Sequence, residues 1–185
     1  MTRSTPQPIV LVGPPASGKT TVGRALAARL REPFADVDAL VEARAGRSIP
    51  QIFAADGEAA FRALEAAAVT EALGRGGVVA LGGGAVETPA VREALAGLPV
   101  VWLTVSRDVA LARADGDSRP LLSGTDRAAA WQRLADGRAE LYAGVAGLRL
   151  DTSAATPDEL AEAIATGLHR SHNTPHRGHD KEKQQ

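Results

Sequence analysis

The stretch GPPASGKT, residues 13–20, fits the pattern G-x-x-x-x-G-K-[ST] of a phosphate-binding P-loop. A strand-like apolar run, Ile9 to Val12, precedes it, and a helical pattern, Val22 to Leu30, follows it, as the motif requires. In such a loop the backbone N–H groups and the helix N-terminus face phosphate oxygens, while Lys19 supplies a cation and Thr20 offers a hydroxyl to Mg²⁺. We therefore expect a bound nucleoside triphosphate; a chance glycine-rich turn is the weaker alternative.

Composition narrows the class of protein. The 185 residues are 44% hydrophobic and 23% charged, which is typical of one globular domain, and the absence of cysteine excludes disulfides and thiol catalysis. A net charge of -1 gives no electrostatic reason to expect nucleic acid, and no apolar run approaches the roughly 18 residues of a membrane span. A cytoplasmic location is expected by default. Lys19 is the only lysine before Lys181, which marks its position as special.

Strand-like and helical segments alternate along the chain. The apolar, β-branched runs are Ile9 to Val12, Phe34 to Val37, Val78 to Leu81, Val100 to Val105 and Leu148 to Leu150. The Ala-, Leu-, Glu- and Arg-rich stretches between them have helical spacing, so the chain is predicted to be α/β, a doubly wound parallel sheet with helices on both faces.

The polar composition of the C-terminal residues sets the predicted domain boundary. Residues 1–168 are predicted to form one folded domain, with helices from Gly57 to Leu73 and from an Asp126 N-cap towards Tyr142. The loop around 114–125 has the Gly, Asp, Ser and Pro content of a mobile segment, and 169–185 is expected to be a disordered polar tail. All four histidines lie in that tail, where we interpret them as solvated rather than as a metal site.

Two sequence features of other P-loop protein classes are absent, and their absence indicates how the nucleotide is used. No N-K-x-D guanine-reading sequence is present, which disfavours a GTPase switch. The third strand ends in Gly82-Gly83-Gly84 where many P-loop ATPases place an Asp for Mg²⁺ or water activation. The sequence therefore favours a phosphotransferase that acts on a small molecule.

Two aspartates lie beside the second strand and are candidates for metal and acceptor chemistry. Asp36 and Asp38 are two residues apart, so both carboxylates would point the same way if the segment is extended. One could hold a Mg²⁺-bound water and the other could accept a hydroxyl proton. The alternative is an ordinary acidic cap at a strand-to-helix junction.

Four arginines are candidates for anion binding. Arg62 is three residues before Glu65, either as a surface ion pair or as a guanidinium held ready for a substrate carboxylate. Arg138 lies on the apolar stripe of its helix, so it needs either an internal carboxylate or a bound anion. Arg119, in the 114–125 loop, could reach the transferring phosphoryl group or could be solvated, and Arg113 could stack on the nucleotide base.

The ordered set of motifs resembles the shikimate kinase family from about Ile9 to Leu168. The motifs are the P-loop, F-x-D-x-D at 34–38, F-R-x-x-E at 61–65, G-G-G at 82–84, R-P-L-L at 119–122 and R-x-x-L-Y at 138–142. The resemblance implies a monomeric, nucleoside-monophosphate-kinase-like fold with a five-stranded parallel sheet in the order 2-3-1-4-5. It also implies transfer of the γ-phosphoryl of ATP to the 3-hydroxyl of shikimate, a step towards chorismate and the aromatic amino acids.

The same resemblance implies a role for each matched residue. Lys19 would contact phosphates, Asp36 and Thr20 would serve Mg²⁺, and Asp38 would bind ring hydroxyls and act as the candidate base or merely orient the hydroxyl. Arg119 would close over ATP as part of a lid at about 114–125. The nucleotide-binding set is Gly13, Ala16, Ser17, Gly18, Lys19, Thr20, Thr21, Arg113 and Arg119. The acceptor-binding set is Asp38, Phe53, Phe61, Arg62, Gly83, Gly84 and Arg138.

Two rival functions follow from the same residues. Another small-molecule kinase, such as one for gluconate, would share the P-loop but is disfavoured by the arginine pair combined with the glycine run. A silent P-loop protein that binds nucleotide and signals to a partner is disfavoured by the intact Lys19, Asp36, Asp38 and Arg119.

Overall fold

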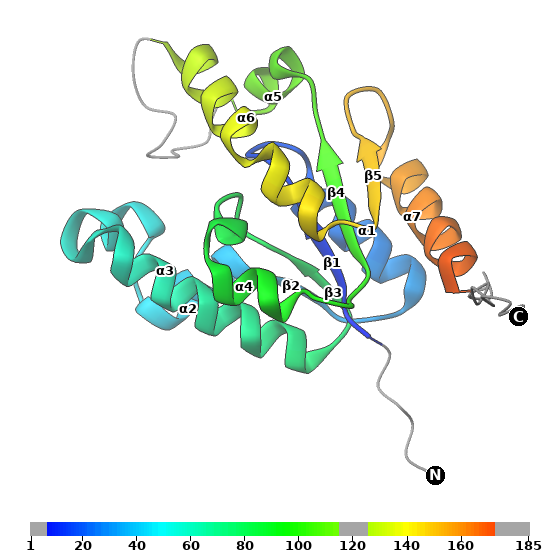
Figure 1. Cartoon of the computed structure of the whole chain (residues 1–185), viewed down its shortest axis with the longest axis horizontal. Helices are drawn as coiled ribbons and strands as arrows, with labels where there is room; N and C mark the ends of the chain where they lie inside the picture. The colour runs from blue at the N-terminus through cyan, green and yellow to red at the C-terminus, as the bar shows by residue number, and fades with distance from the viewer. Residues whose placement is uncertain (1–6, 115–125, 173–185) are drawn as a thin grey trace, which may run out of the picture.

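The computed structural model describes residues 7–114 and 126–172, with side chains up to Leu168. A five-stranded parallel sheet lies at its centre, in the order β2-β3-β1-β4-β5, as predicted (Figure 1). The strands are β1 Ile9–Val12, β2 Phe34–Asp36, β3 Val78–Ala80, β4 Val100–Thr104 and β5 Leu148–Asp151. Leu11 of β1 pairs with Ala80 of β3 on one side and with Val101 of β4 on the other, so the central strand is the one that leads into the P-loop.

Alternation along the central strand explains why helices cover both faces of the sheet. Val10 and Val12 contribute to one apolar core, whereas Leu11 between them contributes to a second. The first core includes residues from α3, α4 and α6, and the second is closed by α1 and α7, which lie together on the other face (Figure 1). The helices are α1 Lys19–Leu30, α2 Val37–Ala45, α3 Ile49–Arg75, α4 Pro89–Ala94, α5 Arg107–Ala114, α6 Arg127–Val145 and α7 Pro157–His172, with a short 3-10 helix, η1, at Ala85–Glu87.

The two predicted helices are present with revised ends. Gly57 (φ 81°) interrupts α3, so the predicted Gly57 to Leu73 segment is the second part of a longer helix that starts with a capping box at Ser48. Asp126 caps α6 as predicted, because its side chain accepts a hydrogen bond from the backbone N–H of Ala129 at 3.0 Å. Helix α7 continues to His172, four residues into the stretch that was predicted to be a tail.

Some predicted features lie outside the described residues. They are nearly all of the predicted lid, including Arg119, and residues 173–185 of the tail. In the described part of the chain no helix is both long and apolar enough to cross a membrane.

Gly77 joins α3 to β3 in a conformation that a side chain would disturb. Its φ is +79°, and a Cβ atom there would lie 2.3 Å from the backbone oxygen of Pro33. Gly74, three residues earlier and still inside α3, has no atom within 4 Å of such a Cβ. The same substitution should therefore have opposite effects at the two positions.

We expect Gly77→Ala to lower the free energy of unfolding by about 2 kcal/mol or more, because the left-handed φ and the backbone clash add together. Gly74→Ala should raise it by roughly 0.5–1 kcal/mol, because alanine is the better helix former and nothing obstructs it. Urea unfolding of both variants measures these changes. Equal destabilisation by the two substitutions would contradict the assignment of the strain to Gly77.

Candidate active site

The P-loop connects β1 to α1 and places Lys19 at the first turn of the helix. Gly18 precedes the helix in a left-handed conformation, and the buried Lys19 Nζ donates hydrogen bonds to the carbonyl oxygens of Gly13 and Pro14, each at 2.9 Å. The ammonium group therefore lies folded over the loop that its motif predicts for phosphate binding. This geometry places a cation and a helix N-terminus together, which is the arrangement that stabilises bound phosphate.

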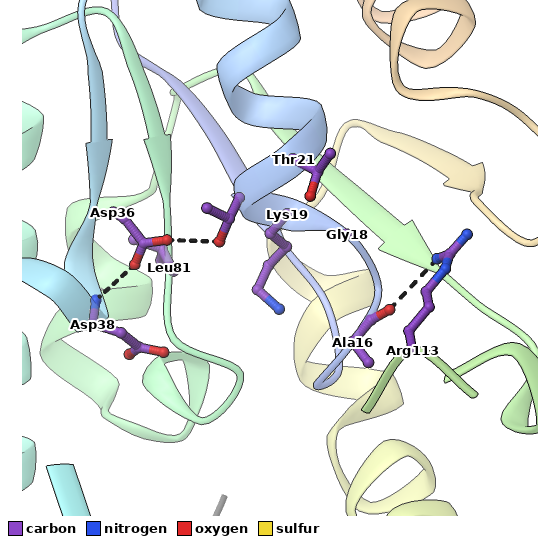
Figure 2. Close-up of a pocket in the computed structure, with 9 residues that line it drawn as sticks. Ala16, Gly18, Lys19, Thr21, Asp36, Asp38, Leu81 and Arg113 are labelled. Carbon is purple, nitrogen blue, oxygen red and sulfur yellow. Dashed lines mark hydrogen bonds between the residues drawn. The ribbon is translucent and has the colours of Figure 1, made fainter. Parts of the chain in front are cut away.

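A pocket of about 400 Å³ opens beside this loop (Figure 2). It brings together most of the residues that the sequence assigns to the nucleotide and the metal. Its lining residues are Ala16, Gly18, Lys19, Thr20, Thr21, Asp36, Asp38, Leu81 and Arg113. The predicted residues Gly13 and Ser17 belong to the same loop, with Ser17 fully buried beneath it. The volume is within the range of sites that bind small molecules.

Thr20 and Asp36 meet at the edge of the pocket and form a site that fits Mg²⁺. The Thr20 hydroxyl donates a hydrogen bond to Asp36 Oδ2 at 2.6 Å, while Asp36 Oδ1 caps α2 by accepting from the backbone N–H of Asp38 at 3.1 Å (Figure 2). Mg²⁺ prefers oxygen ligands and usually combines one or two protein groups with phosphates and water. A hydroxyl and a carboxylate beside a P-loop therefore suit it. Among the described residues, this site included, no group of three or more His, Cys, Asp or Glu side chains gathers as a metal site, so phosphate and water oxygens would have to complete the coordination of Mg²⁺.

Asp36 and Asp38 do not lie side by side on one extended segment, so that prediction is wrong. The segment is not extended through both residues, because Asp36 ends β2 and caps the helix in which Asp38 occupies the first turn. The acidic cap and the candidate site are thus the same structure rather than alternatives. Asp38 still reaches the pocket, because the helix turns it towards the end of β3.

Gly82 shows how closely Asp38 approaches Glu65. A Cβ atom on Gly82 would lie 2.6 Å from Asp38 Oδ1 and 2.5 Å from Glu65 Oε1, so both carboxylates close over the same bare backbone. Glu65 is 1% exposed, and burial raises its pKa, opposed by Arg62 and reinforced by the nearby Asp38. The interpretation of Arg62 and Glu65 as a surface pair is therefore wrong.

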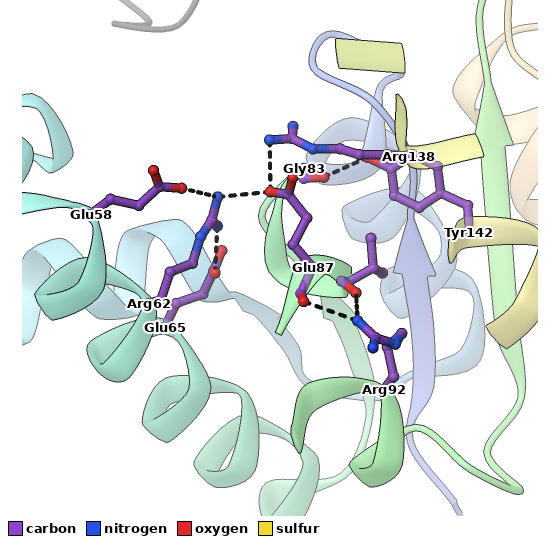
Figure 3. A network of polar contacts seen from close by, with 9 residues as sticks. Glu58, Arg62, Glu65, Gly83, Glu87, Arg92, Arg138 and Tyr142 are labelled. Carbon is purple, nitrogen blue, oxygen red and sulfur yellow. Dashed lines mark hydrogen bonds and ion pairs between the residues drawn. The ribbon is translucent and has the colours of Figure 1, made fainter. Parts of the chain in front are cut away.

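Arg62 and Arg138 converge from different helices on one carboxylate. The Arg62 guanidinium pairs with Glu65 at 2.8 Å and with Glu58 at 3.2 Å, and its Nη2 also contacts Glu87 Oε2 at 2.9 Å. Arg138 Nη2 contacts the same Glu87 Oε2 at 2.8 Å (Figure 3). Two cations that share one oxygen define a place where a carboxylate binds strongly.

Arg138 is the more deeply buried of the two arginines. Its side chain is 6% exposed, and its Nε is buried with no hydrogen-bond partner among the described residues. The sequence left open whether an internal carboxylate or a bound anion would satisfy this charge, and the structure supplies Glu87, whose own side chain is 41% exposed. The unused Nε leaves one donor for a further acceptor.

The glycine run joins the pocket to the arginine pair. A Cβ atom on Gly83 would lie 3.5 Å from the backbone nitrogen of Pro15, and one on Gly84 would lie 2.4 Å from Arg62 Nη2. The Tyr142 hydroxyl donates a hydrogen bond to the Gly83 carbonyl, and burial raises the pKa of this phenol far above its usual value. A side chain would clash with the two carboxylates at Gly82 and with the Arg62 guanidinium at Gly84, whereas at Gly83 it would only touch the P-loop.

The two aromatic candidates for the acceptor site, Phe53 and Phe61, lie together beside the Arg62 side chain. Their ring centroids are 4.7 Å apart, and the Arg62 guanidinium carbon lies 5.4 Å from the Phe61 ring centroid. Phe61 is 4% exposed and belongs to the core. A cation above an aromatic face in a half-buried site is held in place electrostatically as well as by packing.

Arg113 lies on the nucleotide side, opposite Asp36. Its guanidinium donates to Thr152 Oγ1 at 3.1 Å, to the Thr152 carbonyl at 2.7 Å and to the Ala16 carbonyl at 3.5 Å. Thr152 in turn donates to the Ser17 carbonyl at 3.1 Å. Residues far apart in the chain thus hold one wall of the pocket against the P-loop.

Helix α6 is tied to the P-loop through its first turns. Trp131 is buried, and its indole N–H donates to the Pro15 carbonyl at 3.0 Å. Trp131 and Arg138 are seven residues apart and lie on the same helical stripe. One helix therefore contacts the phosphate loop at one point and the arginine pair at another.

The structure adds residues that sequence reasoning did not assign. They are Glu87, Thr152, Leu81 and Trp131, the last noted only as an apolar position of its helix. Thr152 directly follows β5, and Glu87 closes the short helix η1 that follows the glycine run after β3. Their positions after strand ends, at the carboxyl edge of a parallel sheet, were the signal available.

Comparison with known proteins agrees with this geometry. The sequence model of the shikimate kinase family matches residues 15–169. A curated shikimate kinase of Mycobacterium avium is 47% identical over 161 residues, covering 86% of this chain and 92% of that protein. The solved structure of the Acinetobacter baumannii shikimate kinase, in complex with shikimate, superposes with a TM-score of 0.87 at 35% identity, covering 91% of this chain and 96% of that one.

One solved structure with a similar fold belongs to a different kind of small-molecule kinase. A gluconokinase of Sinorhizobium meliloti superposes with a TM-score of 0.58 at 24% identity, covering 91% of this chain and 95% of that one, which shows a shared fold and nothing more. The family match and the identity to shikimate kinases cover nearly all of the described residues. By its sequence and its fold, this chain belongs to the shikimate kinase family.

Proposed function

We propose that this chain is an ATP-dependent shikimate kinase that transfers the γ-phosphoryl of ATP to the 3-hydroxyl of shikimate, a step in aromatic amino-acid biosynthesis. One observation carries the proposal: Arg62 and Arg138 converge on a single carboxylate oxygen, and a bare glycine run joins them to the P-loop pocket. Shikimate presents one carboxylate and three hydroxyls. A cation pair, an aspartate and a glycine strand end match those groups.

ATP would bind through the P-loop. Its backbone N–H groups and Lys19 would hold the phosphates, and Arg113 with the wall around Thr152 would face the base. Thr20 and Asp36 would hold Mg²⁺, directly or through water, and the ion would neutralise charge on the phosphates. Arg119 remains a predicted phosphate contact.

The acceptor would bind on the other side of the glycine run. Arg62 and Arg138 would clamp its carboxylate, while Asp38 and the backbone of Gly83 would face the ring hydroxyls. The 3-hydroxyl oxygen forms a bond to the γ-phosphorus as the bond to the β–γ bridging oxygen breaks. The hydroxyl proton goes to Asp38, and ADP and shikimate 3-phosphate leave.

We further propose that the protein works as a cytoplasmic monomer. No partner is needed to complete this arrangement, because the residues proposed for both substrates come from the same chain.

The substrate is tested first by a coupled ADP-release assay with Mg²⁺ and ATP. Shikimate should give release at least about tenfold above quinate, gluconate and no acceptor, because quinate adds a hydroxyl beside the carboxylate and gluconate has no ring to hold its hydroxyls in place. Strong release with gluconate instead would favour the other kinase. A protein that binds ATP but releases ADP with none of the acceptors would support the silent P-loop alternative.

Replacement of the buried clamp arginine should separate the two substrates. Arg138→Ala is expected to raise the KM for shikimate at least about 30-fold and to leave the KM for ATP nearly unchanged, because a buried charge pair is lost on the acceptor side only. Arg133→Ala, on an exposed position of the same helix, is the control. Equal damage to both substrates would argue against the clamp.

Substitution of Asp38 and of Asp36 should affect different kinetic quantities. Asp38→Asn is expected to lower kcat by about 100-fold or more without changing the Mg²⁺ requirement, because it removes the proton acceptor. Asp36→Asn should instead raise the Mg²⁺ concentration needed for half-maximal rate. Titration of Mg²⁺ at saturating shikimate measures both effects, and an Asp38→Asn enzyme of full activity would exclude this residue as a necessary base.

A further inference from the structure

Glu87 occupies the point where the two arginines of the proposed acceptor site converge. Its Oε2 lies 2.9 Å from Arg62 Nη2 and 2.8 Å from Arg138 Nη2, so one oxygen accepts from both cations (Figure 3). A substrate carboxylate clamped by the same two guanidinium groups would need the same donors. The protein thus carries an internal carboxylate at the place proposed for the external one.

The backbone that carries Glu87 is held in place, whereas its side chain has room to leave. Arg92 on α4 donates to the carbonyl oxygens of Val86 at 2.6 Å and Glu87 at 3.0 Å, and the Glu87 N–H donates to Gly84 at 2.9 Å. The Glu87 side chain is 41% exposed. Rotation of the carboxylate into water therefore needs no movement of the short helix η1.

The arginines differ in how much they depend on Glu87. Arg62 also pairs with Glu58 and Glu65, so it keeps two carboxylates when Glu87 leaves. Arg138 has Glu87 as its ion-pair partner among the described residues, and its Nε is unused. Glu65 also acts electrostatically on Arg138, but Glu87 is the carboxylate in direct contact with it. Because a buried guanidinium is costly without an anion in contact, the departure of Glu87 is favoured by the arrival of another carboxylate.

We propose that Glu87 is a specificity-determining residue that competes with the acceptor's carboxylate for Arg62 and Arg138. This inference rests on the proposed function. Glu87 keeps the arginine pair neutralised while the acceptor site is empty, and a ligand must supply a carboxylate to displace it. Glu87 therefore weakens binding of the acceptor. Only an acceptor that carries a negative charge can replace Glu87 beside both arginines.

The test compares two carboxylates that contact Arg62. Glu87→Gln and Glu87→Ala remove the carboxylate that both arginines share. Glu58→Gln is the control, because it removes a negative charge that contacts Arg62 at 3.2 Å. The Glu58 side chain is 65% exposed and makes no contact with Arg138 in the described structure. Calorimetry gives the Kd for shikimate, for its neutral methyl ester and for ATP. Steady-state rates give KM and kcat, and thermal melting establishes that each variant is folded.

We expect both Glu87 variants to bind shikimate about threefold to tenfold more tightly than the unaltered protein, since a half-exposed competing ion pair is removed. The KM for shikimate should fall by a similar factor while kcat and the Kd for ATP stay within about twofold. The methyl ester should gain much less, because a neutral ligand does not replace the anion. Glu58→Gln should change the Kd for shikimate by less than twofold.

Two results would overturn the inference alone. One is shikimate binding that is unchanged or weaker in folded Glu87→Gln and Glu87→Ala, which would make Glu87 a support for the arginines. The other is an equal gain in Glu58→Gln or with the methyl ester, which would indicate a general charge effect. Unaltered protein that neither binds shikimate nor releases ADP with it would overturn the proposed function and this inference together.

Discussion

All five strands run in the same direction, so their carboxyl ends meet at one edge of the sheet, and the rest of the site depends on that constraint. The central strand ends in the P-loop, β2 ends in Asp36, and β3 leads into the glycine run. Each of these segments carries one chemical function. Parallel pairing brings them together without long insertions, since every return to this edge is made by a helix on one face or the other.

The parts of the site that local sequence determines were predictable. The P-loop contains its own turn, cation and hydroxyl, and the apolar runs around it indicate the strands because they have the length and composition of buried parallel strands. Arg138 could be singled out because a charge on an apolar helical stripe needs a partner. The identity of that partner could not be predicted, because Glu87 lies 51 residues away and meets Arg138 only through tertiary packing.

Asp36 and Asp38 both line the pocket as predicted, but they do not lie on one extended segment. An acidic residue at the end of a strand can either continue the strand or cap the next helix, and their spacing fits both. The cap forms, and it turns Asp38 towards Glu65 over Gly82. Burial was equally hidden for Glu65, because nothing in its own helix shows that the glycine run will cover it.

Helix α6 contacts both the P-loop and the arginine pair, which bears on the proposed binding of nucleotide and acceptor. Trp131 ties its beginning to Pro15 of the P-loop, and Arg138, two turns later, belongs to the arginine pair. Any movement of the loop that shifts α6 would therefore also shift Arg138. By thermodynamic reciprocity, whatever change in acceptor affinity this causes must equal the change in nucleotide affinity caused by the acceptor. One helix thus gives the phosphate loop and the arginine pair a shared structural element.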